Sequence, residues 1–194
     1  MGDDLIARAR RVLADYRPRP AGVEVADARD AAVLVLLADY LGEAHVVLTL
    51  RTDTVEHHKG QISFPGGARH GKDEDLVLTA LRETWEEIGV HPHDVDLIGR
   101  LDEIVTVSNF RVAPFVGVLK RTPYPYAPSP VEVAEVLEVP LRHLLDPANK
   151  VYEPRVAWGG GSAFSPVYWY HSYRIWGATA RMLEGFLDLL ERGP

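Results

Sequence analysis

Three glutamates lie close together in the segment ALRETWEEIGV, residues 80–90, where their spacing could support metal chemistry. Glu83, Glu86 and Glu87 are three and four positions apart, so on a helix they fall within an arc of roughly 100°. Like charges at these spacings repel by about 0.2–0.5 kcal/mol per pair. A divalent cation would offset this repulsion, because Mg²⁺ is commonly held by carboxylates together with water and phosphate oxygens. A solvated acidic face that binds nothing is the alternative explanation.

The helix expected to carry these glutamates spans residues 75–88, and Gly89 is a natural stop for it. Glu86 and Glu87 then lie in its last turn, where the helix dipole disfavours each exposed negative charge by about 0.3–1 kcal/mol. Two features favour a bound cation. The acidic row lacks a Lys or Arg at i+4, and the preceding FPGG lets the backbone approach a ligand closely. The apolar face opposite the glutamates consists of Val77, Ala80, Leu81, Thr84 and Ile88.

The rest of the chain predicts strands and further helices around this segment. Runs at 31–40 and 44–52 are rich in aliphatic and β-branched residues and predict two buried strands joined by a turn. Residues 54–75 predict a long polar loop with a short strand at 62–64, and long loops in compact domains tend to be functional. Together the elements predict an α/β sandwich with mixed strand directions. Further strands are expected within 95–107, 110–120, 131–139 and 151–176, and helices at about 3–16, after Pro140 and at 177–192.

Composition limits the function classes that remain. The 194 residues fit a single domain, 1–194. The net charge of −7 argues against a general nucleic-acid binder, and the absence of cysteine excludes disulfides, thiol catalysis and Cys-ligated zinc. No membrane span or targeting signal is recognised. We therefore expect a cytoplasmic protein, with its oligomeric state open.

Residues 67–90, GARHGKDEDLVLTALRETWEEIGV, resemble the Nudix box, Gly-x5-Glu-x7-Arg-Glu-U-x-Glu-Glu-x-Gly-U, where U is bulky and apolar. The second half of the box fits residues 82–90, with Thr84 as a mild departure. Glu74 stands eight positions before Arg82, as the box requires, whereas the stretch from Gly67 to Glu74 is one residue longer than the general pattern. The resemblance implies the Nudix-type α/β/α sandwich with a mixed β-sheet.

Residues 47–67, VLTLRTDTVEHHKGQISFPGG, are similar to the signature of coenzyme A pyrophosphatases within the Nudix superfamily. That signature reads Leu-Leu/Met-Thr-x-Arg-Ser/Ala-x3-Arg/Lys-x3-Gly-x3-Phe-Pro-Gly-Gly. Thr49, Arg51, Gly60 and residues 64–67 fall in register, whereas Glu56 replaces a basic residue. Segments 106–117 and 175–183 also look like later parts of the family, so the similarity covers about 32–190.

The resemblance implies a divalent-metal-dependent hydrolase that cleaves the pyrophosphate of coenzyme A, or of a derivative, to 3′,5′-ADP and 4′-phosphopantetheine. Glu83, Glu86 and Glu87, with the carbonyl of Gly67, are expected to hold Mg²⁺ or Mn²⁺. Arg82 is expected to orient the glutamates through hydrogen bonds, and Glu86 is the preferred general base. The alternatives are a Nudix hydrolase of ADP-ribose or dinucleotides and a catalytically inactive Nudix-fold binding module.

Substrate contacts are expected from Arg51, Lys59, Gly60, Phe64 and Gly66. Arg51 is the best candidate for the 3′-phosphate of coenzyme A, because a guanidinium can grip a phosphate with two hydrogen bonds. The alternative is that Arg51 only pairs with a neighbouring acid.

Several other polar and aromatic residues carry alternative readings. The basic candidates near the box are Arg69 and Lys72, with His57, His58 and His70 as neighbours that lack a zinc spacing. Glu132 and Glu135 are either surface residues or assisting bases. Six aromatic residues are expected in the core and strands rather than as an adenine platform: Trp158, Trp169, Trp176, Tyr168, Tyr170 and Tyr173.

Overall fold

The computed structural model describes residues 4–22, 27–53, 60–71, 73–156 and 161–192. Its helices are α1 (Leu5–Asp15), α2 (Leu76–Ile88), α3 (Leu141–Leu145) and α4 (Gly177–Arg192), with single 3₁₀ turns at Pro92–Asp94 and Pro147–Asn149. The strands of its main sheet are β1 (Arg29–Tyr40), β2 (Glu43–Arg51), β3 (Ile62–Ser63), β4 (Gly66–Ala68), β5 (Val95–Arg100), β6 (Ile104–Val105), β7 (Phe110–Leu119) and β8 (Val133–Pro140). A second sheet contains β9 (Lys150–Val156), β10 (Ser162–Tyr170) and β11 (Tyr173–Ile175).

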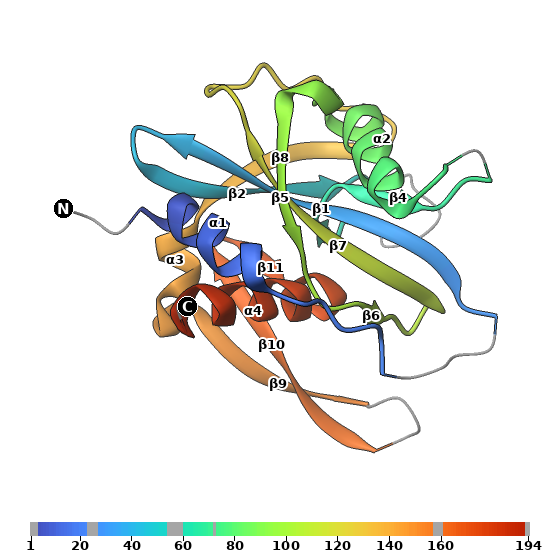
Figure 1. The fold of residues 1–194 in the computed structure, drawn as a ribbon. Coiled ribbons are helices and arrows are strands. Elements are labelled where there is room, and N and C mark those ends of the chain that lie inside the picture. Colours follow the sequence, from blue (N-terminus) through green and yellow to red (C-terminus); the bar gives the residue numbers. More distant parts are fainter. Residues whose placement is uncertain (1–3, 23–26, 54–59, 72, 157–160, 193–194) are drawn as a thin grey trace.

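The main sheet is mixed and lies between helices (Figure 1). Its central pair, β1 and β7, is parallel, whereas the β1–β2, β5–β7 and β2–β8 pairs are antiparallel. Helix α2 covers one face, and α1 and α4 cover the other. The predicted α/β/α sandwich with a mixed sheet is therefore confirmed.

Strand β1 explains why its sequence is apolar without a break. Alternate residues point into two cores, with Leu34 and Leu36 on the α2 side and Val35 and Leu37 on the α1 and α4 side. All four side chains are fully buried. A strand that is buried on both faces needs an apolar residue at every position rather than at every second one.

The segment that precedes α2 is inserted between two strands that diverge. Strands β1 and β2 pair along Leu36–Tyr40 and Glu43–Val47, and they separate beyond Leu36. From there, β3 continues the pairing with β2 and β4 continues it with β1. The FPGG turn between β3 and β4 is therefore held in the middle of the sheet, directly under α2.

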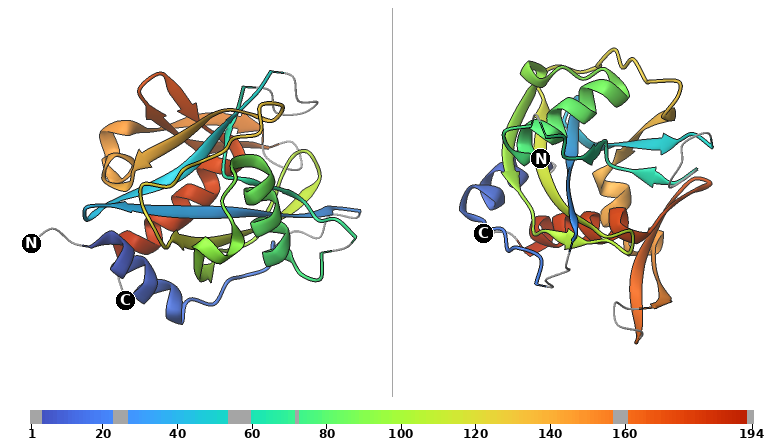
Figure 2. Two further views of the ribbon diagram at one scale, coloured as in Figure 1. Left: turned by 90° about the horizontal axis from the view of Figure 1, so that it is seen from above. Right: turned by 90° about the vertical axis from the view of Figure 1, so that its right-hand side faces the viewer.

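The second sheet projects from the α4 side of the molecule. Strands β9, β10 and β11 pair in antiparallel order, and the β9–β10 hairpin extends away from the sandwich (Figures 1 and 2). The sequence predicts these strands but not a sheet separate from the first. Among the described residues, no helix combines the length and the apolar character that crossing a bilayer requires.

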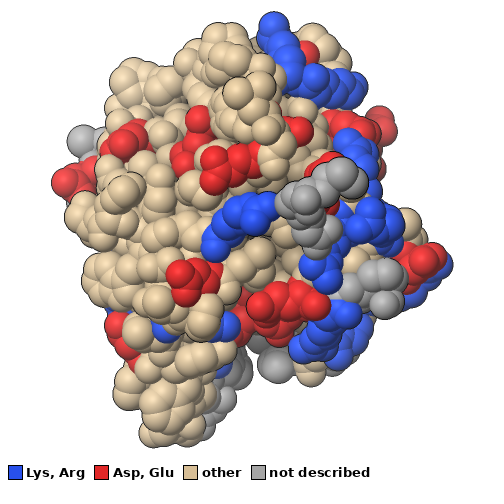
Figure 3. Space-filling view, turned by 90° about the vertical axis from the view of Figure 1, so that its left-hand side faces the viewer, with Lys and Arg blue, Asp and Glu red and all other residues tan. Residues whose placement is uncertain are grey.

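Acidic and basic side chains are intermixed on the face of the molecule seen in Figure 3. Lys and Arg gather mostly toward the right of this view, with Asp and Glu among them. Because the chain carries a net charge of −7, attraction of an anionic substrate must come from local groups inside a site.

Candidate active site

Helix α2 is fixed at both ends, which sets the positions of its glutamates. The Asp75 side chain caps the first turn by accepting a hydrogen bond from the Leu78 N–H, 2.9 Å away. Gly89 ends the helix in the left-handed conformation at φ 74°. The last carbonyls accept backbone N–H groups from the loop before β8, Ala127 to Ile88 and Ser129 to Glu87. These bonds satisfy part of the negative helix terminus at which Glu86 and Glu87 lie.

Glu87 is a buried carboxylic acid. It is 1% exposed, and its carboxylate accepts a 3.2 Å hydrogen bond from the Gly66 N–H and forms a 3.2 Å ion pair with Arg51. Burial raises the pKa of the Glu87 carboxyl to about 7; Arg51 and the Gly66 N–H oppose the shift, and the charges of Glu83 and Glu132 add to it. Burial also raises the pKa of Glu83, with Arg82 opposing the change.

Glycine at position 67 leaves room for the side chain of Glu83. A Cβ atom at Gly67 would lie 2.6 Å from the Glu83 carboxylate, so a larger residue there would displace that carboxylate. The close approach expected from FPGG is thus an approach of backbone to a catalytic candidate.

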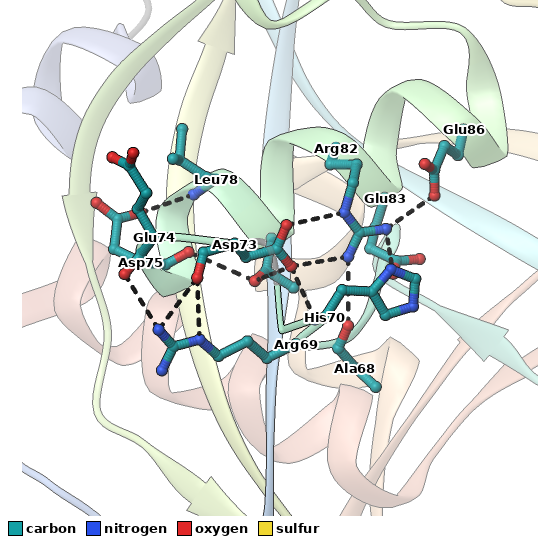
Figure 4. Close-up of polar contacts among 11 residues, drawn as sticks. Ala68, Arg69, His70, Asp73, Glu74, Asp75, Leu78, Arg82, Glu83 and Glu86 are labelled. Atoms are coloured by element: carbon teal, nitrogen blue, oxygen red, sulfur yellow. Dashed lines mark hydrogen bonds and ion pairs between the residues drawn. The ribbon is translucent and has the colours of Figure 1, made fainter.

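Arg82 is the centre of a hydrogen-bond network that holds the box together (Figure 4). Its guanidinium donates to both oxygens of Asp73 at 3.1 and 3.0 Å, and to Glu83 and Glu86 at 2.8 Å each. It also donates to the Ala68 carbonyl at 3.3 Å. The acidic face therefore has a basic partner four positions before Glu86, and Arg82 contacts Glu83 and Glu86 by hydrogen bonds as the sequence predicts.

Asp73 is the residue that sequence reasoning missed. Its carboxylate is 8% exposed, and the hydrogen bonds from Arg82 hold its pKa well below its usual range. Glu74 is exposed, and its backbone carbonyl, not its side chain, accepts a hydrogen bond from Arg69. The spacing of the box, counted back from Arg82, indicates Glu74 as the acidic residue. Counting forward from Gly67 reaches Asp73 after five residues, and this spacing identifies the partner of Arg82.

We expect Asp73→Asn to lower turnover by about ten- to a hundredfold, because Arg82 would lose the carboxylate that orients it toward Glu83. We also expect the free energy of unfolding to fall by a few kcal/mol, since a buried ion pair loses one partner. Glu74→Gln is the matched control and should leave both quantities unchanged. Steady-state kinetics and urea unfolding of the two variants measure this, and a larger effect at Glu74 would show that the alignment through Glu74 is the correct one.

The side chain of Glu86 is more exposed than those of Glu83 and Glu87, although it shares the Arg82 Nη1 donor with Glu83. It is 51% exposed and is held by Arg82 on the outside of the helix. It does not line the cavity described below, whereas Glu83, Glu87 and Glu132 do. Its expected roles as ligand and general base therefore gain no support from its position.

A cavity of about 1110 Å³ opens beside Glu83 and Glu87. Its wall is largely apolar and comes from β1, the FPGG turn, the β6–β7 loop, the β9–β10 hairpin and the start of α4. Of the residues expected to contact substrate, Arg51, Phe64 and Gly66 line this cavity, and Gly60 does not. Of the aromatic residues expected in the core, Tyr168 is buried there, whereas Trp176 lines the cavity and is 41% exposed. Four of the predicted residues lie outside the described part of the chain: His57, His58, Lys59 and Lys72; Trp158 does as well.

Glu83 and Glu87 fit a divalent cation by the chemistry of their donors. Both carboxylates line the cavity, both pKa values are raised by burial, and each carboxylate is destabilised by further acids nearby. Oxygen ligands are those that Mg²⁺ and Mn²⁺ prefer, and Mg²⁺ needs only one or two protein carboxylates because water and phosphate complete its shell. Within the described residues, no three His, Asp or Glu side chains converge as a complete ligand set. Two carboxylates and a substrate phosphate are consistent with that arrangement.

The raised pKa of Glu87 predicts how the stability of the metal-free protein depends on pH. The pKa of Glu87 is about 7 in the folded chain and 4.5 for an ordinary glutamate, so this carboxyl stays protonated to a higher pH when the chain is folded. The protonated carboxyl avoids the cost of burying a charge. Its contribution to the free energy of unfolding is fully present below about pH 4.5 and is lost as the pH rises through 7. Relative to the wild type, the free energy of unfolding of Glu87→Gln should therefore increase by up to about 3 kcal/mol as the pH rises from 5 to 8.

Urea unfolding of both proteins in a chelating buffer at the two pH values measures this difference. A constant difference between wild type and variant would contradict the raised pKa.

Comparison with known proteins places the box within a wider similarity. The model of the NUDIX domain matches residues 28–158. The chain is 37% identical to the human protein named mitochondrial coenzyme A diphosphatase NUDT8 over 192 residues, which covers 96% of this chain and 78% of that protein. It is 38% identical to the uncharacterized Nudix hydrolase NudL of Cronobacter sakazakii over 157 residues, or 80% of each protein.

Solved structures support the fold alone. The Nudix hydrolase RenU of M. smegmatis matches with a TM-score of 0.51 and 22% identity, over 61% of this chain and 74% of that one. A MutT protein of Methanosarcina mazei matches with a TM-score of 0.50 and 18% identity, over 92% and 95% of the two chains.

Proposed function

The chain belongs to the Nudix hydrolase family, and from that membership we propose that it cleaves the pyrophosphate bond of coenzyme A or a coenzyme A derivative. The observation that carries the proposal is the similarity to human NUDT8, which spans nearly the whole chain at 37% identity and includes the segments that form the cavity. The cavity supports it in size and character, because coenzyme A combines a charged nucleotide with a long, mostly uncharged pantetheine arm and needs a site with both polar and apolar walls.

We assign different roles at the diphosphate to different residues: binding a cation, orienting the carboxylates and accepting a proton. Glu83 and Glu87 would hold Mg²⁺ or Mn²⁺, with the Gly67 carbonyl as the further ligand that the family resemblance implies. Such a cation would supply charge neutralisation of the diphosphate and a more acidic water. Arg82 orients Glu83, while Arg51 and the Gly66 N–H orient Glu87. Glu132 lines the cavity, and we propose it in preference to Glu86 as the carboxylate that accepts the proton of the attacking water.

A substrate panel tests the proposal. The wild type should hydrolyse coenzyme A to 3′,5′-ADP and 4′-phosphopantetheine with Mg²⁺ or Mn²⁺, and a chelator should abolish the reaction. In H₂¹⁸O, one of the two phosphate products should carry the label, because water attacks directly. Faster hydrolysis of ADP-ribose or of a dinucleotide would favour the alternative substrates. Absence of turnover on every substrate would contradict an enzyme acting on nucleoside diphosphates.

Two expectations from the sequence remain predictions. A cytoplasmic location is one, and the human relative is named mitochondrial. The absence of a nucleic-acid partner is the other, and it rests on the net charge of −7.

A further inference from the structure

Arg181 is a partly buried arginine in the wall of the cavity. It lies in the second turn of α4, and its guanidinium Nη2 donates a 3.0 Å hydrogen bond to the carbonyl of Val105 in β6. This bond directs the side chain across the gap between α4 and the β6–β7 connection. Thr106, Val107 and Ser108 from that connection line the same cavity. Arg181 is thus held in place by the fold at one end of the site.

The charge of Arg181 is not neutralised by a carboxylate in the way that the charges of Arg51 and Arg174 are. Arg51 pairs with Glu87, and Arg174 pairs with Glu153. No carboxylate of the described residues forms an ion pair with Arg181. Burial lowers the pKa of its guanidinium, and the positive charge of Arg155 lowers it further. A guanidinium removed from water and placed beside a like charge is unfavourable, and an anionic ligand would offset this cost.

The amino-terminal end of α4 adds to the positive potential. Gly177, Ala178 and Thr179 line the cavity next to Arg181. The helix spans 16 residues, so its dipole contributes a partial positive charge at this end. The environment of Arg181 therefore favours an anion.

Arg181 and the glutamates lie at opposite ends of the cavity. Gly67, beside Glu83, pairs with Ala32 in β1, and Ala32 pairs with Ala113 in β7. Strand β6, whose Val105 anchors Arg181, pairs with the other edge of β7. Three strand spacings separate the two backbones, or about 14 Å.

We propose that Arg181 binds the 3′-phosphate of coenzyme A while Glu83 and Glu87 act on the diphosphate. This inference rests on the proposed function. The ribose separates the two phosphate positions, as the cavity separates the two groups of residues. A phosphate monoester offers the planar guanidinium two oxygens and nearly two charges. The sequence predicts this contact for Arg51, whose Nη1 instead pairs with the buried carboxylate of Glu87.

Binding of two product-like nucleotides tests the contact without turnover. Adenosine 3′,5′-bisphosphate carries the phosphate in question, and adenosine 5′-monophosphate lacks it. Calorimetric titration of the wild type should give a dissociation constant at least about tenfold lower for the bisphosphate, as expected for a charge-assisted hydrogen bond. Arg181→Gln should weaken binding of the bisphosphate by about ten- to a hundredfold and leave the monophosphate nearly unchanged. Arg181→Lys should restore part of the loss.

Arg192→Gln is the matched control, because it removes the same charge from the exposed end of the same helix. It should leave both dissociation constants unchanged. Equal binding of the two nucleotides by the wild type, or a preference that survives in Arg181→Gln, overturns the inference.

Turnover separates this inference from the proposed function. If the wild type cleaves coenzyme A and dephospho-coenzyme A, the function stands, and the ratio of their kcat/KM values should fall in Arg181→Gln by the factor measured in binding. An unchanged ratio places the 3′-phosphate elsewhere. If neither compound is cleaved, the proposed function fails, and the nucleotide titration still decides whether Arg181 binds a phosphate monoester. A variant that loses only a preference for acyl groups with a free carboxylate would assign Arg181 to the other end of the substrate and contradict the proposal.

Discussion

Glu83→Gln and Glu87→Gln are each expected to lower kcat by about a thousandfold or more, because stabilisation of the diphosphate by a bound cation contributes several kcal/mol to the transition state. An amide keeps the size of the side chain and one acceptor oxygen, so at position 87 the Gly66 N–H still has a partner. What the amide loses is the negative charge that a cation requires. Stability should therefore hold or rise while activity is lost.

Glu86→Gln is the control for this pair. It lies between the two on the same helix, is exposed, and does not line the cavity, so we expect it to keep most of the activity. Kinetics at saturating Mg²⁺, together with calorimetric titration of Mn²⁺ into each variant, measures catalysis and cation binding separately. Near-normal turnover of either the position 83 or the position 87 variant would remove that residue from the ligand set. A loss at position 86 as large as at the other two would restore the three-glutamate assignment.

Gly66→Ala is expected to cost about 2–6 kcal/mol of folding stability, the largest effect of any single methyl group in the site. Gly66 has φ 150°, which L-residues rarely adopt, and a Cβ there would lie 2.3 Å from the Ala32 carbonyl oxygen and 2.5 Å from the Val33 Cα. Both atoms belong to the backbone of β1 in the centre of the sheet, so neither can move away cheaply. The turn would have to shift, and with it the N–H that holds Glu87.

Gly185→Ala is the opposite case and serves as the comparison. Gly185 lies within α4, and a Cβ there meets nothing within 4 Å. Alanine in a helix interior stabilises by about 0.5–1 kcal/mol relative to glycine. Urea unfolding at one pH and fixed cation concentration should therefore separate the two variants in sign. A Gly66→Ala protein as stable as the wild type would contradict this prediction, because it would mean that the backbone of β1 can move to accommodate the methyl group at little cost.

The local elements were predictable because their signals are local. The spacing of apolar residues in α2 indicates its buried face, and Gly89 marks its end. The unbroken apolar run of β1 is what a strand between two cores requires. The direction in which a side chain points at a helix boundary is a different matter. Asp73 and Glu74 are adjacent acids before the helix, and only the turn of the chain decides which of them meets Arg82. The two spacings of the box point to different residues, because five residues separate Gly67 from Asp73 and seven separate Glu74 from Arg82.

The far wall of the cavity was beyond sequence reasoning for a similar reason. Arg181 belongs to an amphipathic helix and follows the apolar Ala180, which predicts burial of the helix face but not what the face covers. Its partner carbonyl, Val105, is 76 positions away. Trp176 was assigned to the core by its aromatic character, and it lines the cavity instead. Contacts between distant segments depend on the packing of whole elements, which periodicity within one element does not encode.

The parallel pairing of β1 with β7 has a consequence for how fast this protein can fold. Ala31 pairs with Val112, so the centre of the sheet closes only after the intervening segment of about 80 residues, which includes β2, the FPGG turn and α2, has been looped out. Closing so long a loop costs conformational entropy before any of the central contacts are gained. We therefore expect the β1–β7 pair to form late and to limit the folding rate, with the β1–β2 hairpin and α2 already present. Substitutions in β7 should then slow refolding, and those at the exposed surface of α2 should not.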